Sequence, residues 1–187
     1  MDVTGDATEP GGVDDLVSPG LRVLFCGINP GQTSGRLAQH FARPGNRFWK
    51  LLDAAGFTPG LVAPSEQERL LGYGIGITNV VERVTGGAAD LVPAELRAGA
   101  LVLGDKVARF RPAFVAVLGL GAYRVAFSRP RAQVGRQPEL LGGAHLWLLP
   151  NPSGLQARYQ LAEMTEQYIA LRLEADRVLG PVRQLGH

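Results

Sequence analysis

The sequence has few of the residues on which several classes of protein depend. It contains one cysteine, Cys26, which excludes an internal disulfide framework and an iron–sulfur cluster held by four cysteines of this chain. No apolar run reaches the length of a membrane span, and the N-terminus lacks the basic start and apolar stretch of a signal peptide. We therefore expect a cytoplasmic protein without membrane contact.

Lysine is also scarce, and the positive charge comes almost entirely from arginine. Lys50 and Lys106 are the only lysines among 19 basic side chains. Residues 1–18 hold five acids and no Lys or Arg, so the net charge of +2 for the whole chain becomes +7 on residues 19–187. The stretch 109–138 carries six arginines and no acid. Because arginine suits phosphate geometry, this pattern fits a nucleic-acid partner, but it also fits a solvated basic face in a protein from a GC-rich genome.

The length of 187 residues suits one domain with a sizeable core. Residues 1–20 are acidic, rich in Gly and Pro and without periodicity, which predicts a disordered tail ahead of a domain over 21–187. From Leu21 onward, apolar runs alternate with segments of helical periodicity. Strands are expected at 21–27, 74–81, 113–119 and 145–150, and helices at 46–56, 64–74, 93–112, 121–127 and 155–180.

Near-continuous apolar strands separated by helices predict an α/β fold. We expect one mainly parallel central sheet of four to five strands with helices on both faces. In such sheets ligands bind outside the carboxyl ends of the strands. Three polar turns, GINPG, GITN and LPNPSG, follow expected strands there. If the strands are parallel, Asn29, Asn79 and Asn151 meet at one edge of the sheet.

Four motifs in this order, GINPG, PGNRFW, GITN and NPSGLQA, resemble the mismatch-specific uracil/thymine DNA glycosylases, a branch of the uracil-DNA glycosylase superfamily. The likeness runs from about Leu21 into the C-terminal helix. It implies a uracil-DNA glycosylase-like fold and an enzyme of base excision repair. Such an enzyme flips uracil, thymine or a damaged pyrimidine out of mismatched duplex DNA and hydrolyses its N-glycosidic bond, leaving an abasic site. Flipping costs a few kcal/mol and is cheapest at a mismatch.

The resemblance places Asn29 at the catalytic position. An amide is a poor general base, but it can hold a water molecule beside C1′ while an oxocarbenium-like transition state forms. The rigid Pro30–Gly31 turn would keep the amide aimed, although Asn in such a turn can also serve the turn alone. Asn79 stands where a Lys is frequent in the family, and the loss of that cation removes a possible partner for Asn29 and the leaving base. A carboxylate could then help to activate the water. Asp90 is the expected alternative activator.

The same resemblance assigns Phe41 as the ring that stacks on the flipped pyrimidine. An ordinary core Phe is the alternative. His40 beside it is expected to face solvent, and donation to a uracil oxygen is the alternative. Gln32 and Thr33 are expected to line the pocket with Ser34. The residues expected to bind the substrate are Gly27, Ile28, Pro30, Gly31, Ser34, Phe41, Asn46 and Asn79.

The NPSGLQA segment resembles the loop that penetrates DNA, with Leu155 as the apolar wedge that fills the space of the flipped base. A capping box between Ser153 and Gln156 is the alternative interpretation. Ala157 stands where the family often has a cation, which predicts looser reading of the opposite base unless Arg158 substitutes. The residues expected to contact DNA are Asn151, Pro152, Ser153, Gly154, Leu155, Gln156, Ala157 and Arg158.

The two lysines lie inside expected helices, so a Schiff base with the abasic sugar is not expected and the enzyme should be monofunctional. We expect a monomer that acts on double-stranded DNA without a metal or a cofactor. Two other classes stay open. One is a DNA-damage binder without catalysis on the same fold. The other is a nucleotide-cofactor protein, suggested by GLGAYR at 119–124, which lacks the third glycine of a dinucleotide-binding motif.

Overall fold

The computed structural model describes residues 11–153 and 160–182, folded around one five-stranded sheet. The strands are β1 (Val23–Gly27), β2 (Ile75–Asn79), β3 (Phe114–Leu118), β4 (Gly135–Leu141) and β5 (Ala144–Leu149). Their order is β2-β1-β3-β5-β4, and only β4 runs antiparallel to its neighbour. The expected α/β fold with a mainly parallel sheet is confirmed.

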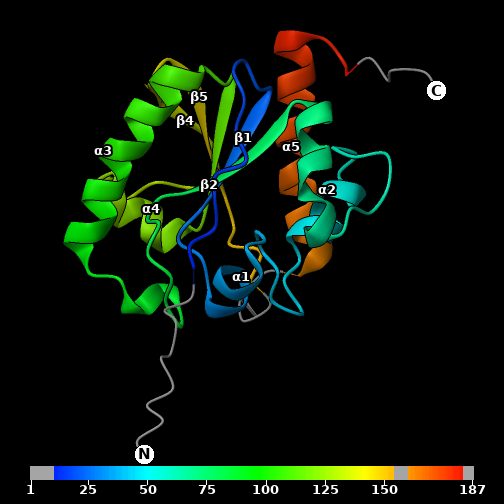
Figure 1. Cartoon of the computed structure of the whole chain (residues 1–187). Helices are drawn as coiled ribbons and strands as arrows, with labels where there is room; N and C mark the ends of the chain where they lie inside the picture. Colours follow the sequence, from blue (N-terminus) through cyan, green and yellow to red (C-terminus); the bar gives the residue numbers. More distant parts are fainter. Residues whose placement is uncertain (1–10, 154–159, 183–187) are drawn as a thin grey trace, which may run out of the picture.

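The helices form one layer on each face of the sheet. They are α1 (Gln32–Leu37), α2 (Phe48–Ala54), α3 (Pro93–Phe110), α4 (Leu120–Ala126) and α5 (Leu161–Leu179), with 3₁₀ helices η1 (Pro64–Tyr73) and η2 (Ala88–Asp90). Figure 1 shows α3 and α4 on one face, α2 and α5 on the other, and α1 below the sheet. None of the helices in the described residues is long and apolar enough to cross a membrane.

Strands β1 and β3 are apolar throughout because each of them is covered on both faces, whereas β2, the first strand in the order, ends in Thr78 and Asn79. All five residues of β1, β2 and β3 are buried. Side chains alternate between the faces, so Phe25 packs between Phe48 at 5.4 Å and Tyr168 at 6.0 Å. Its neighbour Leu24 joins Leu103 of α3 in the opposite core.

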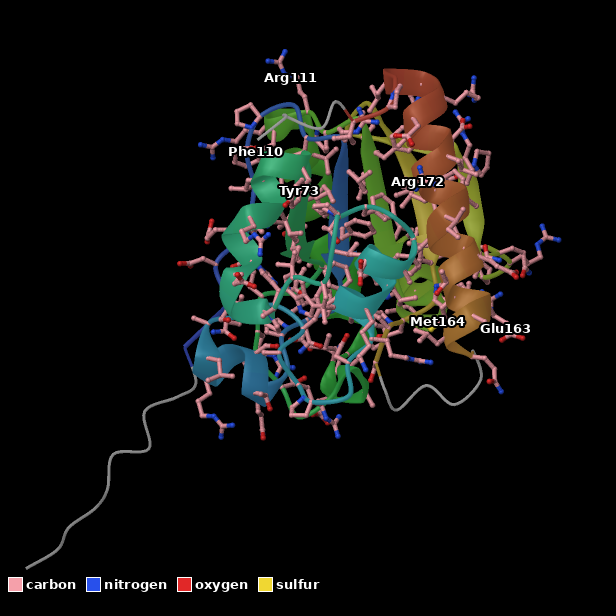
Figure 2. All side chains as sticks on the ribbon, turned by 90° about the vertical axis from the view of Figure 1, so that its right-hand side faces the viewer. Tyr73, Phe110, Arg111, Glu163, Met164 and Arg172 are labelled. Atoms are coloured by element: carbon pink, nitrogen blue, oxygen red, sulfur yellow. The ribbon has the colours of Figure 1, made fainter. Side chains whose placement is uncertain are left out.

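The ends of the two long helices follow ordinary capping chemistry. The Glu95 carboxylate accepts the Val92 N–H at 2.9 Å before α3, and Glu163 accepts the Gln160 N–H at 3.0 Å before α5. Figure 2 shows Glu163 at the beginning of α5 and Arg172 further along it. The expected cap at Ser153–Gln156 is therefore not the one that begins α5, because α5 begins at Leu161.

The N-terminal boundary of the domain lies earlier than expected. Residues 11–20 belong to the expected tail, yet Leu16 is only 4% exposed and exchanges two backbone hydrogen bonds with Ile77 of β2, at 2.9 and 2.8 Å. Asp15 forms an ion pair with Lys106 and accepts a hydrogen bond from Thr78 at 2.6 Å. The Asp15 side chain satisfies the Thr78 and Lys106 donors here, which composition and the lack of periodicity could not indicate. Residues 1–10 of the expected tail lie outside the described residues.

Three elements, α1, η2 and β4, were not expected, and one differs in kind. The short helix α1 lies within the turn region after β1, and the edge strand β4 contains Pro138 and exposed polar residues rather than an apolar run. The segment 64–74 is a 3₁₀ helix rather than an α-helix. Its cap uses Glu66, which accepts the Ala63 N–H at 3.3 Å, instead of the expected pair Ser65 and Glu68.

Candidate active site

The carboxyl ends of β1, β2 and β3 open into a cavity of about 510 Å³. The parallel register sets Gly27 opposite Asn79, and Leu118 ends β3 beside them, so loops that are far apart in sequence meet here. The expected residues that line the cavity are Gly27, Ile28, Asn29, Pro30, Gly31, Gln32, Thr33, Ser34, Phe41, Asn46, Asn79, Asn151 and Ser153.

Some expected residues lie elsewhere. Pro152 is buried outside the cavity lining, and Asp90 is exposed behind the loop that contributes Gly86 and Gly87. Five expected DNA-binding residues lie outside the described part of the chain; they are Gly154, Leu155, Gln156, Ala157 and Arg158.

The amide of Asn29 is oriented by a loop from the next strand. Its Nδ2 donates to Arg83 O at 2.9 Å, to Thr85 Oγ1 at 2.7 Å and, less closely, to Pro30 O at 3.3 Å. A backbone carbonyl can only accept, so the atom facing Arg83 must be the amide nitrogen. Among the described residues no donor reaches Oδ1. The amide oxygen is therefore the group that Asn29 can offer to a bound water.

Thr85 was not expected at the site, and it determines the direction of this contact. It is 6% exposed, and its hydroxyl donates to Gly87 O at 2.7 Å. Since the single hydroxyl proton is used there, Thr85 Oγ1 acts as the acceptor toward Asn29. Thr85 N–H also donates to Pro30 O at 3.2 Å, which ties the loop to the turn that carries Asn29. A threonine in VERVTGG carries no sequence signal for this role, because the contact spans 56 residues.

Phe41 provides a ring at the cavity wall and is held in a costly conformation. Its φ of 50° lies in the left-handed region, which a bulky residue rarely adopts. The ring packs on Phe48 at 4.2 Å between centroids, with an interplanar angle of 32°. A Cβ atom at Gly27 would lie 3.2 Å from the Phe41 ring and 2.6 Å from Asn79 Oδ1. Only glycine at this strand end lets both side chains approach the backbone so closely, and the strained backbone of Phe41 makes that residue a candidate for function.

His40 does not face solvent, contrary to expectation. It is 2% exposed and lines the cavity, and its Nε2 lies 2.9 Å from Asp14 O. Because that carbonyl can only accept, Nε2 carries a proton. Burial lowers the pKa of the imidazole, although the bond to Asp14 opposes that effect, so His40 is neutral near pH 7. The N-terminal segment thus supports the cavity wall, which sequence spacing did not reveal.

The loop that leads toward residue 154 is braced by Arg47 of the PGNRFW motif. Its N–H donates to Pro152 O at 3.0 Å, and its guanidinium donates to Ser153 O at 3.1 Å. Asn151 closes a tight turn in the same loop, since its Oδ1 accepts the Ser153 N–H at 2.9 Å. These contacts fix the start of the loop relative to α2 and the cavity.

The cavity contains no carboxylate among its described lining residues, which include His40 and the exposed Arg43 as basic groups. Asp90 instead accepts the Gly87 N–H at 3.1 Å through Oδ2 and caps η2. Its expected role in activating water therefore stays a prediction. Within the described residues no group of His, Cys, Asp or Glu could hold a metal ion. The arrangement suits the positioning of a neutral water and the holding of a planar ring.

A comparison with protein families matches residues 15–174 to a family described as the uracil DNA glycosylase superfamily. The matched range covers most of the chain. It begins inside the packed N-terminal segment and contains every cavity-lining residue described above.

Proposed function

The chain belongs to the uracil DNA glycosylase superfamily, whose members are DNA glycosylases of DNA repair, and on that basis we propose that it removes uracil from mismatched duplex DNA. In this proposal the protein is a monofunctional hydrolase that acts as a monomer in the cytoplasm. Thymine and damaged pyrimidines form the wider proposed substrate class. The observation that carries this proposal is the amide of Asn29, whose nitrogen is held at 2.7 and 2.9 Å while its oxygen stays available at the cavity.

In the proposed reaction the bond between C1′ and the base nitrogen breaks, and the bonding electrons leave with the base. Asn29 Oδ1 accepts a hydrogen bond from a water whose oxygen then bonds to C1′ of the oxocarbenium-like sugar. One water proton passes to solvent, and the departing base anion gains a proton from solvent. The products are an abasic sugar and the free base. This chain's residues orient the water and the ring rather than exchange protons with them.

The flipped base would lie against Phe41, where stacking contributes about 1–3 kcal/mol. Phe48 supports the other side of that ring at 4.2 Å. Asn79 offers both an amide donor and an acceptor, a pairing that matches the adjacent N3–H and carbonyl oxygen of uracil. Its position beside Gly27 supports a role in reading the edge of the base.

A single-turnover assay in the presence of a chelator tests the proposal. Duplexes with G·U, A·U and G·T, and single-stranded DNA with U, would be compared for the wild type, Asn29→Ala and Asp90→Ala. Asn29→Ala should lose about a hundredfold or more in rate. An unchanged Asn29→Ala rate removes the water-positioning role, and a collapse in Asp90→Ala transfers it to that carboxylate. Borohydride trapping of the protein on abasic DNA would contradict a monofunctional enzyme.

A non-catalytic DNA-damage binder on the same fold is the second candidate. The oriented amide of Asn29 favours catalysis, because a binder has no need of a positioned water. The two are separated by alkali treatment after incubation, since a binder retards a mismatched duplex in a gel and leaves every base attached.

A further inference from the structure

A second cavity, of about 570 Å³, lies between the end of α4 and the edge strand β4. We call it the arginine groove, because Arg129, Arg131 and Arg136 line it together with the polar Gln133. It lies mostly within the arginine-rich stretch 109–138 of the sequence.

One end of the arginine groove lies at the same end of the sheet as the candidate active site. Gly135, the first residue of β4, pairs with Leu148 near the carboxyl end of β5. The loop after β5 contributes Asn151 and Ser153 to the active-site cavity. β4 is two strands from β3 and three from β1, and strands are about 4.8 Å apart, so β4 lies roughly 10–14 Å to the side of the strands that bring Leu118 and Gly27 to the active-site cavity. That distance corresponds to about three or four nucleotides of a B-form strand.

The groove is held in shape by internal hydrogen bonds. The guanidinium of Arg124 donates twice to Ala132 O, at 3.1 and 2.8 Å. Gln137, which is 8% exposed, donates to Gln133 O at 2.8 Å and to Gly135 O at 3.0 Å. These donors satisfy loop carbonyls that would otherwise repel a phosphate. Because the loop is already ordered, ligand binding carries little entropic cost for ordering it.

The charge of the groove is only partly neutralised. Arg129 pairs with Glu139 at 2.6 Å, and Arg136 pairs with Glu174 at 2.7 Å. Arg131 is exposed and forms no ion pair within the described part of the chain. Its guanidinium is thus available to an anion, and arginine binds phosphate oxygens in a two-pronged geometry.

We propose that the arginine groove binds backbone phosphates of duplex DNA about three or four nucleotides from the flipped base, with Arg131 as the direct contact. The inference rests on the proposed function, because it takes the active-site cavity as the place of the flipped base. A phosphate contact at this distance orients the duplex across the end of the sheet. It adds affinity without reading sequence.

Arg131→Asn tests the proposal, with Arg111→Asn as the matched control. Arg111 is also exposed, and Figure 2 shows it at the end of the molecule opposite α1. Its φ of 51° lies in the left-handed region, which Asn tolerates, so the control should fold normally. Dissociation constants would be measured for a duplex with a stable abasic-site analogue, over about 50 to 200 mM salt.

For Arg131→Asn we expect several-fold weaker binding and a slope of log affinity against log salt that is smaller by about one. The single-turnover rate at saturating enzyme should stay unchanged, and Arg111→Asn should match the wild type in both measurements. An unchanged salt slope for Arg131→Asn overturns the proposal, and so does an equal change in both variants.

Shortened duplexes locate the contact. Truncation to about two base pairs beyond the analogue should abolish the difference between wild type and Arg131→Asn on one side only. A difference that persists in both truncated duplexes, each shortened on one side, overturns the proposed position. If no duplex is cleaved but the salt slope still falls by about one, the glycosylase proposal fails while the arginine groove stands. If cleavage is normal and the slope is unchanged, the groove alone fails.

Discussion

Replacement of Thr85 by valine removes one hydroxyl group and nearly preserves the shape of a side chain that is 6% exposed. Two hydrogen bonds are lost with the hydroxyl, one from Asn29 Nδ2 and one to Gly87 O, both at 2.7 Å. The amide of Asn29 keeps Arg83 O at 2.9 Å and the more distant Pro30 O at 3.3 Å. This amide therefore stays in place but loses its closest orienting partner.

The expected magnitudes follow from these contacts. A buried hydrogen bond contributes about 1 kcal/mol net, and an unsatisfied buried group costs about 1–3 kcal/mol, so Thr85→Val should lower the free energy of unfolding by about 2 kcal/mol. If the poorer orientation of the Asn29 amide raises the activation free energy by about 1.4 kcal/mol, the single-turnover rate on a G·U duplex falls about tenfold. Thr85→Ser keeps the hydroxyl and should restore the rate to within about twofold of the wild type.

A double-mutant cycle separates positioning from general damage. Thr85→Val and Asn29→Ala should be strongly non-additive in rate, because Thr85 acts only through the amide that Asn29→Ala removes. Rates would be measured by single-turnover cleavage at saturating enzyme, and stability by urea denaturation of the same samples. A wild-type rate for Thr85→Val, or full additivity with Asn29→Ala, would refute the assignment of Thr85 as a positioning residue.

Gly27→Ala would place a Cβ atom 2.6 Å from Asn79 Oδ1, so the Asn79 amide must move. The single-turnover rate should then fall more than tenfold, while the free energy of unfolding measured with urea drops by only about 1–2 kcal/mol. Burial lowers the pKa of His40, so the unfolded chain binds a proton here more readily than the folded protein does. The free energy of unfolding of the wild type should therefore decrease as pH falls below about 6.5, and His40→Gln should not show this decrease in denaturation curves. Asp15→Asn weakens the ion pair with Lys106 and should cost about 2 kcal/mol of unfolding free energy. An unchanged transition midpoint would show that this ion pair adds no stability.

Patterns along the chain were sufficient for the central part of the fold. Strand β1 was expected from LRVLFC and α3 from the segment 93–112, because burial on both faces or on one stripe imposes those patterns directly. The convergence of Asn29 and Asn79 also followed, since parallel strands bring their carboxyl ends together. The edge strand β4 was missed because it is covered less completely and needs no apolar run.

By itself, therefore, the sequence determined the parallel α/β architecture and the group of polar turns at one edge of the sheet. Only the tertiary structure decided which atom of the Asn29 amide is held by hydrogen bonds, because that depends on Thr85 and Arg83 more than fifty residues away. It also decided that His40 is buried against Asp14. Hydrophobic burial acts on every residue of an element and leaves a periodic trace in sequence. A hydrogen bond between two distant groups depends on one position in each loop and leaves none.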